Sequence, residues 1–115
     1  MLARNQWALA GTWSVEDQPA RLTSATGQIF FRFHARDVNL VMGPADRAAP
    51  VRFRVLIDGE PPGPAHGTDI DDQGVGTLRE QRMYQLARQQ GAITDRTFEI
   101  EFLDTGAEAF VFTFG

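Results

Sequence analysis

Hydrophobic and polar residues alternate with a period of two along most of the chain. In 28–35 (QIFFRFHA) the alternation places Ile29, Phe31 and Phe33 on one side of the segment. Such spacing predicts a strand with one face buried and the other in water. The strands predicted from this pattern are 6–15, 20–25, 28–35, 38–42, 51–58, 82–88, 96–104 and 108–115. Residues 79–90 are the one stretch that also admits a helix, and the strand is favoured there.

Turn-forming segments rich in Gly, Pro and Asp separate these strands. Examples are 25–28 (ATGQ), 42–50 (MGPADRAAP) and 58–67 (DGEPPGPAHG). About eight short strands with turns every ~8–12 residues predict an all-β fold, an antiparallel β-sandwich of jelly-roll type. A chain of 115 residues is long enough for one such core, so residues 1–115 are expected to form a single domain.

Two oppositely charged pairs occupy the polar faces of the predicted strands. Arg52 and Arg54 alternate with buried positions in one strand, and Glu99 and Glu101 do so in another. Opposite charges on neighbouring strands help to set the register, so these residues are expected to pair across the sheet.

The composition excludes several classes of function. With 43% hydrophobic and 23% charged residues the chain is typical of a folded protein. A formal net charge of -4 opposes binding to nucleic acid. The chain contains no cysteine, so it can neither form a disulfide nor carry out thiol–disulfide exchange. No apolar run approaches the ~20 residues of a membrane span, and direct membrane insertion is not expected.

The acidic segment DIDDQGVGTLRE (69–80) comes close to the spacing of a calcium-binding EF-hand loop. Its fifth position is Gln73, a poorer ligand than Asp or Asn, and the preceding residues 60–68 hold too many prolines for an entering helix. A solvated hairpin that uses the positive φ of Gly74 and Gly76 is therefore favoured. A calcium site of another type, with Asp69, Asp71 and Glu80 as ligands, stays open as the minor alternative.

No constellation of catalytic residues is visible. The two histidines, His34 and His66, lie in a strand and in a Pro/Gly loop, and nothing in their spacing brings them together as zinc ligands. Ser14 and Ser24 lack the sequence context of a nucleophile. We expect a non-enzymatic domain that requires no cofactor.

A binding surface is the remaining type of site. Aromatic side chains can stack on sugar rings, and the candidates for such a platform are Trp7, Trp13, Phe30 and Tyr84. Arg32 and His34 flank Phe30 on the polar face of its strand and could form a polar rim. Packing of the two tryptophans in the core is the alternative.

Longer stretches of the chain resemble a known family. The segments FRFHARDV (31–38), DGEPPG (58–63), AHGTD (65–69) and YQLAR (84–88) are similar to the C-terminal domain of thioredoxin-like redoxin proteins, including the DipZ-type cytochrome c biogenesis proteins. This resemblance implies a sandwich like a carbohydrate-binding module, attached after a thioredoxin-like domain that carries the active cysteines. It also implies that the acidic segment 69–80 is a structural hairpin that presents Tyr84 and Arg88.

On this resemblance the chain is an accessory domain from the C-terminus of a longer thiol–disulfide oxidoreductase, with the thioredoxin-like domain of the same protein as its partner. The leading hypothesis is recognition of a carbohydrate or peptide ligand. The alternatives are a purely structural module for docking or oligomerisation and a calcium-stabilised binding domain. The resemblance also leans toward an extracytoplasmic, periplasmic location.

Overall fold

The computed structural model describes residues 7–14 and 20–115, with side chains from residue 27 onward. Eight strands and one short 3₁₀ turn lie in this part of the chain, and residues 82–88 form a strand, as predicted. The elements are β1 (Trp7–Ser14), β2 (Ala20–Phe33), β3 (Asp37–Pro44), β4 (Val51–Ile57), η1 (Gly63–Ala65), β5 (Val75–Leu78), β6 (Arg82–Arg88), β7 (Arg96–Phe102) and β8 (Ala107–Phe114).

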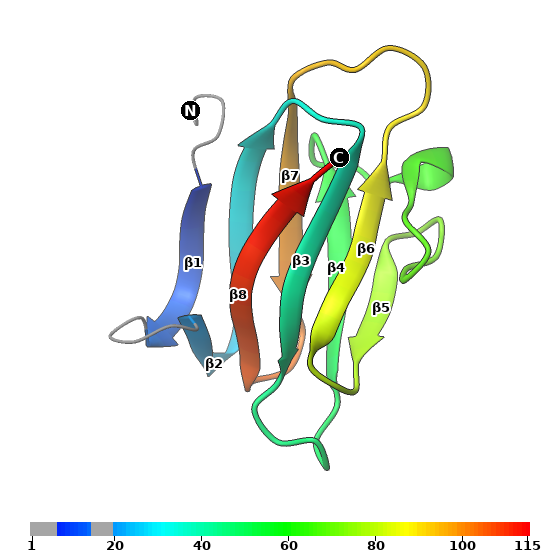
Figure 1. Cartoon of the computed structure of the whole chain (residues 1–115). Coiled ribbons are helices and arrows are strands. Elements are labelled where there is room, and N and C mark those ends of the chain that lie inside the picture. The colour runs from blue at the N-terminus through cyan, green and yellow to red at the C-terminus, as the bar shows by residue number, and fades with distance from the viewer. Residues whose placement is uncertain (1–6, 15–19) are drawn as a thin grey trace.

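The strands form two antiparallel layers that share the long strand β2 (Figure 1). In one layer the hydrogen-bonded order is β1-β2-β7-β4-β5, and in the other it is β8-β3-β6. Residues 27–33 of β2 pair with β7, whereas Ala20 and Arg21 pair with β8. The predicted jelly-roll β-sandwich is confirmed.

The observed strands differ from the predicted ones in two places. The expected turn at 25–28 is wrong, because β2 runs without interruption from Ala20 to Phe33. Gly27 lies inside this strand, between Gly11 and Phe102, and the register of β1 against β2 shifts between Gly11 and Trp13. The glycine thus lies within a paired strand rather than in a turn. The sequence pattern also missed β5, whose four residues include a glycine and show no clear alternation.

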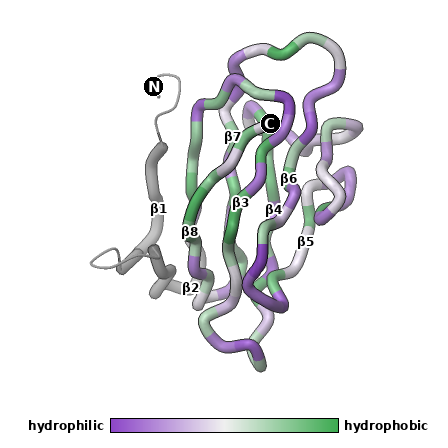
Figure 2. The backbone as a smooth tube through the Cα atoms, in the orientation of Figure 1, coloured by the Kyte–Doolittle hydropathy of each residue, from purple (hydrophilic) through white to green (hydrophobic). Residues whose placement is uncertain are grey.

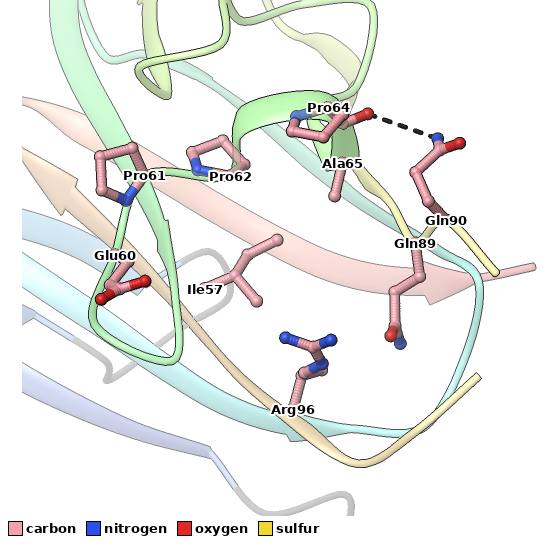
Figure 3. Close-up of a pocket in the computed structure, with 9 residues that line it drawn as sticks. All are labelled: Ile57, Glu60, Pro61, Pro62, Pro64, Ala65, Gln89, Gln90 and Arg96. Carbon is pink, nitrogen blue, oxygen red and sulfur yellow. Dashed lines mark hydrogen bonds between the residues drawn. The ribbon is translucent and has the colours of Figure 1, made fainter. Parts of the chain in front are cut away.

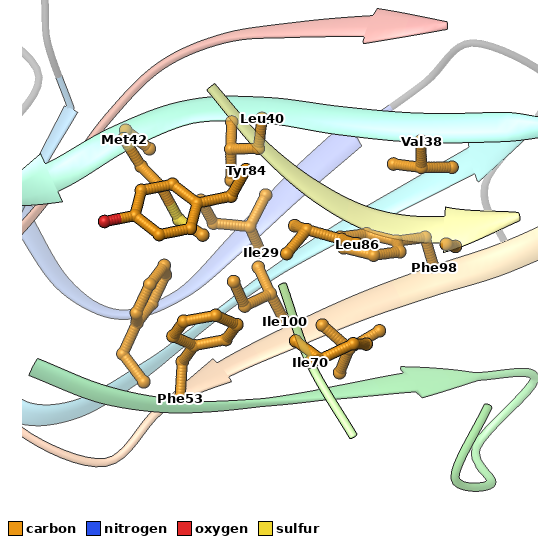
Figure 4. Packing of buried hydrophobic residues seen from close by; sticks show 14 of the residues in the cluster. Ile29, Val38, Leu40, Met42, Phe53, Ile70, Tyr84, Leu86, Phe98 and Ile100 are labelled. Carbon is orange, nitrogen blue, oxygen red and sulfur yellow. The ribbon is translucent and has the colours of Figure 1, made fainter. Parts of the chain in front are cut away.

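The core fills the space between the inner faces of the two layers (Figure 4). Phe53 of β4 packs edge-on against Tyr84 of β6, with ring centroids 6.3 Å apart. Phe98 of β7 packs in the same manner against Phe112 of β8, at 5.8 Å. Both contacts join the two layers, and full burial of Phe53 and of Phe98 contributes about 1.5–3 kcal/mol each.

Most of the predicted inward faces are buried. They include Ile29, Phe31 and Phe33 of β2 and the alternating positions of β3, β4 and β7. Strand β8 differs, because its register against β3 shifts between Val41 and Met42. Ala109 is buried there, whereas Phe112 is only partly buried and Phe114 is 39% exposed. Figure 2 shows the hydrophobic stretches on the strands and mostly hydrophilic residues in the loops.

Only one of the expected charge pairs forms. Arg54 lies opposite Glu101 in the β4–β7 register, and their side chains form an ion pair of 3.3 Å. Arg52 instead binds Asp104, just beyond β7, and Leu56 lies opposite Glu99. No helix in the part of the chain that the structure describes is long and apolar enough to cross a membrane.

Candidate functional site

A polar groove of about 260 Å³ lies along strands β3 and β6. We use the name polar groove for the surface formed by Asp37, Asn39, His66, Gly67, Thr68, Gln85, Ala87 and Arg88. One wall is the loop that runs beside the edge of β6, where Gly67 N donates to Leu86 O at 3.1 Å. A Cβ atom on Gly67 would clash with the carbonyl oxygen of Gln85, so the loop approaches the strand this closely only with glycine.

The groove presents polar groups that have few partners within the protein. Arg88 Nε lies 3.6 Å from Asp37 Oδ1, an oxygen that is enclosed and accepts no hydrogen bond. Thr68 Oγ1 donates to Gln85 Oε1 at 3.1 Å, which leaves the amide nitrogen of Gln85 available. The side-chain amide of Asn39 makes no hydrogen bond to any of the described residues. The amides of Asn39 and Gln85 and the guanidinium of Arg88 thus line one hollow and are available to a polar ligand.

The outer face of the other layer is different, because its charged groups bind one another. Arg52 donates two side-chain hydrogen bonds to Asp104, both at 2.9 Å. These bonds, together with one from the backbone N–H of Arg52, lower the pKa of Asp104 to about 2. Burial and the repulsion of Glu101 raise the pKa of Glu99 on the same face. Arg52 and Arg54 of this face are therefore paired with acidic side chains and are less available to a ligand.

Three of the predicted ligand-binding residues lie at this self-paired face or its edge. Phe30 is half-buried on β2, opposite Glu99. Arg32 Nη1 donates to Thr97 Oγ1 at 3.0 Å, and His34 Nδ1 donates to Asp95 Oδ1 at 2.7 Å. None of the three lines the polar groove.

The two tryptophans of the predicted platform have side chains outside the described residues. Their backbones pair with β2, Trp7 opposite Phe31 and Trp13 opposite Leu22. The register of β1 against β2 shifts between Gly11 and Trp13, so the regular pairing of the strand is interrupted between the two tryptophans.

Tyr84 and Arg88 are separated rather than presented together. Tyr84 is only 2% exposed, and its hydroxyl donates to Glu80 O at 2.6 Å. The guanidinium of Arg82 covers its ring, 3.9 Å from the centroid. Tyr84 is therefore a core residue in this structure. Among the predicted site residues whose side chains the structure describes, Arg88 is the one that lines the polar groove.

The acidic segment 69–80 closes a turn and covers the edge of β6. Asp69 accepts hydrogen bonds from the backbone N–H of Gln85 at 2.7 Å and from Arg82 Nη2 at 2.8 Å. Burial opposes ionisation of Asp69, but these bonds outweigh it and lower its pKa. Asp71 Oδ1 accepts from the N–H groups of Gln73 and Val75 within the turn. Gly74 has the predicted positive φ, but the same prediction for Gly76 is wrong, because Gly76 lies in the extended strand β5.

The three acidic residues of the calcium alternative do not gather around one point. Glu80 contacts Arg82, with Oε1 3.7 Å from Nε, while Asp69 and Asp71 are held by the bonds above. Among the residues that the structure describes, no group of three His, Asp or Glu side chains is arranged to hold a metal ion. The carboxylate of Asp69 instead pairs with an edge N–H that would otherwise be open to another strand.

A second hollow of about 300 Å³ lies at one end of the sandwich (Figure 3). We call it the end pocket. It is formed by the loop after β4, the turn η1 and the segment between β6 and β7. Its lining residues are Ile57, Glu60, Pro61, Pro62, Pro64, Ala65, Gln89, Gln90 and Arg96. Sequence reasoning missed this pocket, although the proline-rich segment 60–64 marks one of its walls.

Comparison with known proteins gives one family and one type of fold. The model of the thioredoxin-like C-terminal domain family matches residues 1–115. The sequence matches none of the curated proteins.

Among solved structures, the chain superimposes on a family two carbohydrate esterase from Clostridium thermocellum in complex with cellohexaose, with a TM-score of 0.64. The sequence identity is 9%, and the match covers 96% of this chain and 31% of the esterase. A family two carbohydrate esterase from Cellvibrio japonicus gives a TM-score of 0.58 at 10% identity, covering 95% and 32%. The chain thus spans about a third of the length of these esterases, and at such low identity the likeness shows the fold alone.

Proposed function

Because the chain belongs to the thioredoxin-like C-terminal domain family, we propose that it is a non-catalytic accessory domain that recognises the target of a thioredoxin-like enzyme through the polar groove. Thiol chemistry requires cysteine, and the chain has none. The redox reaction would belong to the thioredoxin-like part of the full-length protein, and this domain would bring the target to it.

The observation that carries the proposal is the contrast between the two outer faces. On the β7–β4 face Arg52 and Arg54 are paired with acidic side chains, whereas in the groove the amides of Asn39 and Gln85 keep groups that have no partner among the residues that the structure describes. Arg88, whose Nε lies 3.6 Å from Asp37, adds donors on the same surface. Polar groups that converge on a concave surface and lack internal partners are typical of a ligand site.

The ligand class that suits these groups is a neutral, hydroxyl-rich molecule such as a carbohydrate. Each sugar hydroxyl both donates and accepts, and side-chain amides and guanidinium groups can bridge neighbouring hydroxyls. The groove has no large exposed aromatic ring, so hydrogen bonds would provide most of the affinity. Such binding is expected to be weak, with a Kd on the order of 1 mM.

Titration of the 115-residue chain with a panel of mono- and disaccharides tests the proposal. At least one sugar should bind saturably, and Asn39→Ala or Arg88→Ala should weaken its binding about tenfold, as loss of one good hydrogen bond implies. Arg79→Ala is the matched control for Arg88→Ala, because Arg79 is also exposed but lies outside the groove. No saturable binding, or equal loss in the control, would contradict the proposal.

A structural docking role is the second candidate, favoured by an apolar row on the outer face of β8-β3-β6. Val41 pairs with both Val111 and Met83, which are 53% and 44% exposed. Such a row could rest against the thioredoxin-like domain or a second copy of this chain. Sedimentation of the 115-residue chain with and without a thioredoxin-like domain distinguishes ligand recognition from structural docking. Docking would be favoured if the chain associates, Val111→Asp abolishes the association, and no sugar binds.

A further inference from the structure

The structure assigns a second binding site to the end pocket, and we infer that its ligand is a short extended peptide segment with an aliphatic or proline side chain. This inference goes beyond the polar groove and does not rest on it. It depends on one buried amide, one guanidinium group and an apolar lining.

Gln89 is the buried polar residue of the pocket. Its side chain is only 4% exposed, and its amide nitrogen donates to Ala35 O at 2.8 Å and to Thr94 O at 3.1 Å. Both partners are carbonyl oxygens, so the orientation of the amide is fixed with the nitrogen on their side. The remaining atom, Oε1, accepts no hydrogen bond from the described residues and is therefore available to a donor in the pocket.

Arg96 supplies the complementary donor. Its Nη1 donates to Asp58 Oδ2 and its Nε to Thr94 Oγ1, each at 3.1 Å. These two bonds hold the guanidinium in place and leave Nη2 without a hydrogen-bond partner among the described residues. Figure 3 shows Gln89 and Arg96 on one side of the pocket and the proline-rich loop on the other. The pocket thus offers one fixed acceptor and one fixed donor.

Most of the remaining lining is apolar. Glu60 and Gln90 are its two other polar residues, and Gln90 Nε2 donates to Pro64 O at 3.3 Å. Five of the nine residues carry aliphatic or pyrrolidine side chains: Ile57, Pro61, Pro62, Pro64 and Ala65. Ile57 and Ala65 point into the space between the prolines and the two polar side chains (Figure 3). A hollow of about 300 Å³ is at the small end of ligand pockets and has room for one or two amino-acid side chains.

A peptide unit matches this arrangement better than a sugar does. One peptide unit has one N–H for Gln89 Oε1 and one C=O for Arg96 Nη2, and its side chain can pack on the apolar wall. A sugar would turn several hydroxyls toward the prolines and Ile57, where they would lose water without gaining a hydrogen bond.

The test is an NMR titration of the ¹⁵N-labelled 115-residue chain with acetyl-Ala-Val-N-methylamide and acetyl-Ala-Pro-N-methylamide. Acetyl-Ala-Asp-N-methylamide and cellobiose are the comparison probes. The inference expects saturable shifts of the amides in 57–65 and 89–96 with the first two probes only. Equal shifts there with cellobiose would assign the pocket to carbohydrates, and no saturable shift with either apolar peptide would also overturn the inference.

Two variants tie the shifts to the pocket. Ala65→Leu fills the hollow and should weaken peptide binding by about tenfold or more, while Ala48→Leu, in an exposed loop that does not line the pocket, should leave binding unchanged. Arg96→Lys keeps the positive charge beside Asp58 but removes the second terminal nitrogen, and should also weaken binding. Unchanged affinity in both pocket variants would contradict the inference. Groove variants should not alter these shifts, so the two proposals fail separately.

Discussion

Replacing Gly74 with alanine is expected to destabilise the protein more than replacing an exposed glycine with alanine does. Gly74 ends the acidic turn, has a φ of +87°, and its carbonyl accepts a 2.7 Å hydrogen bond from Val55 N of β4. A Cβ atom there would clash with the carbonyl oxygen of Val55 and approach Pro62 Cδ to 3.1 Å. The turn could accept alanine only by moving away from β4.

The expected cost has two parts. An alanine in the left-handed region costs about 1–2 kcal/mol. Moving the turn weakens the bond from Val55 N and loosens the packing beneath it, for about 1–2 kcal/mol more. The sum is about 2–4 kcal/mol, a large share of the ~5–15 kcal/mol by which domains are stable.

Gly59→Ala is the matched control. Gly59 has nearly the same φ, +82°, but nothing lies within 4 Å of the position of its added Cβ atom. Gly59→Ala should lose only the free energy of placing alanine in the left-handed region. The melting temperature of Gly74→Ala should therefore lie several degrees below that of Gly59→Ala, since 1 kcal/mol corresponds to about 4 °C for a chain of this size. Thermal and urea unfolding measure both. Equal stability of the two variants would refute the close approach of the acidic turn to β4.

Three further predictions concern the charged groups. Because the folded state lowers the pKa of Asp104 to about 2, against ~3.9 when unfolded, its bond to Arg52 should stabilise the protein above pH ~4. Arg52→Ala should therefore lower the unfolding midpoint at pH 6 but not at pH 2, and an equal loss at both pH values would contradict this. Folding raises the pKa of Glu99, so the ionised carboxylate destabilises the folded state as the pH rises above ~4. Glu99→Gln should therefore be more stable than the unsubstituted chain at pH 7 but not at pH 3. Since the oxygens of Asp69 and Asp71 are already held by hydrogen bonds, calcium should not raise the melting temperature relative to chelator, and a clear rise would restore the calcium alternative.

The sandwich could be predicted from the sequence because side chains in a half-buried strand repeat every two residues. In β4 and β7 the pattern identified every inward residue, for example Phe53 and Ile100. It failed where the backbone departs from a regular strand. Gly27 suggested a turn but lies inside β2, and the register shift in β8 brings Ala109 into the core and leaves Phe114 partly exposed.

The two hollows could not be predicted, because each depends on segments that are far apart in the sequence. The polar groove joins Asn39 of β3, the loop at Gly67 and Arg88 of β6. The end pocket depends on the orientation of the Gln89 amide, which is set by the carbonyl of Ala35 on another loop. Tyr84, in contrast, was open to a correct prediction, since it shares a period-two face with the buried Leu86.

Chemical-shift mapping with a sugar that binds the chain tests the central claim most directly. The proposed function predicts that the amides of 37–39, 66–68 and 85–88 move together along one saturation curve, while those of 52–54 and 99–101 stay in place. Shifts centred on the β4 and β7 residues, or none at the groove, would contradict a recognition role for this surface.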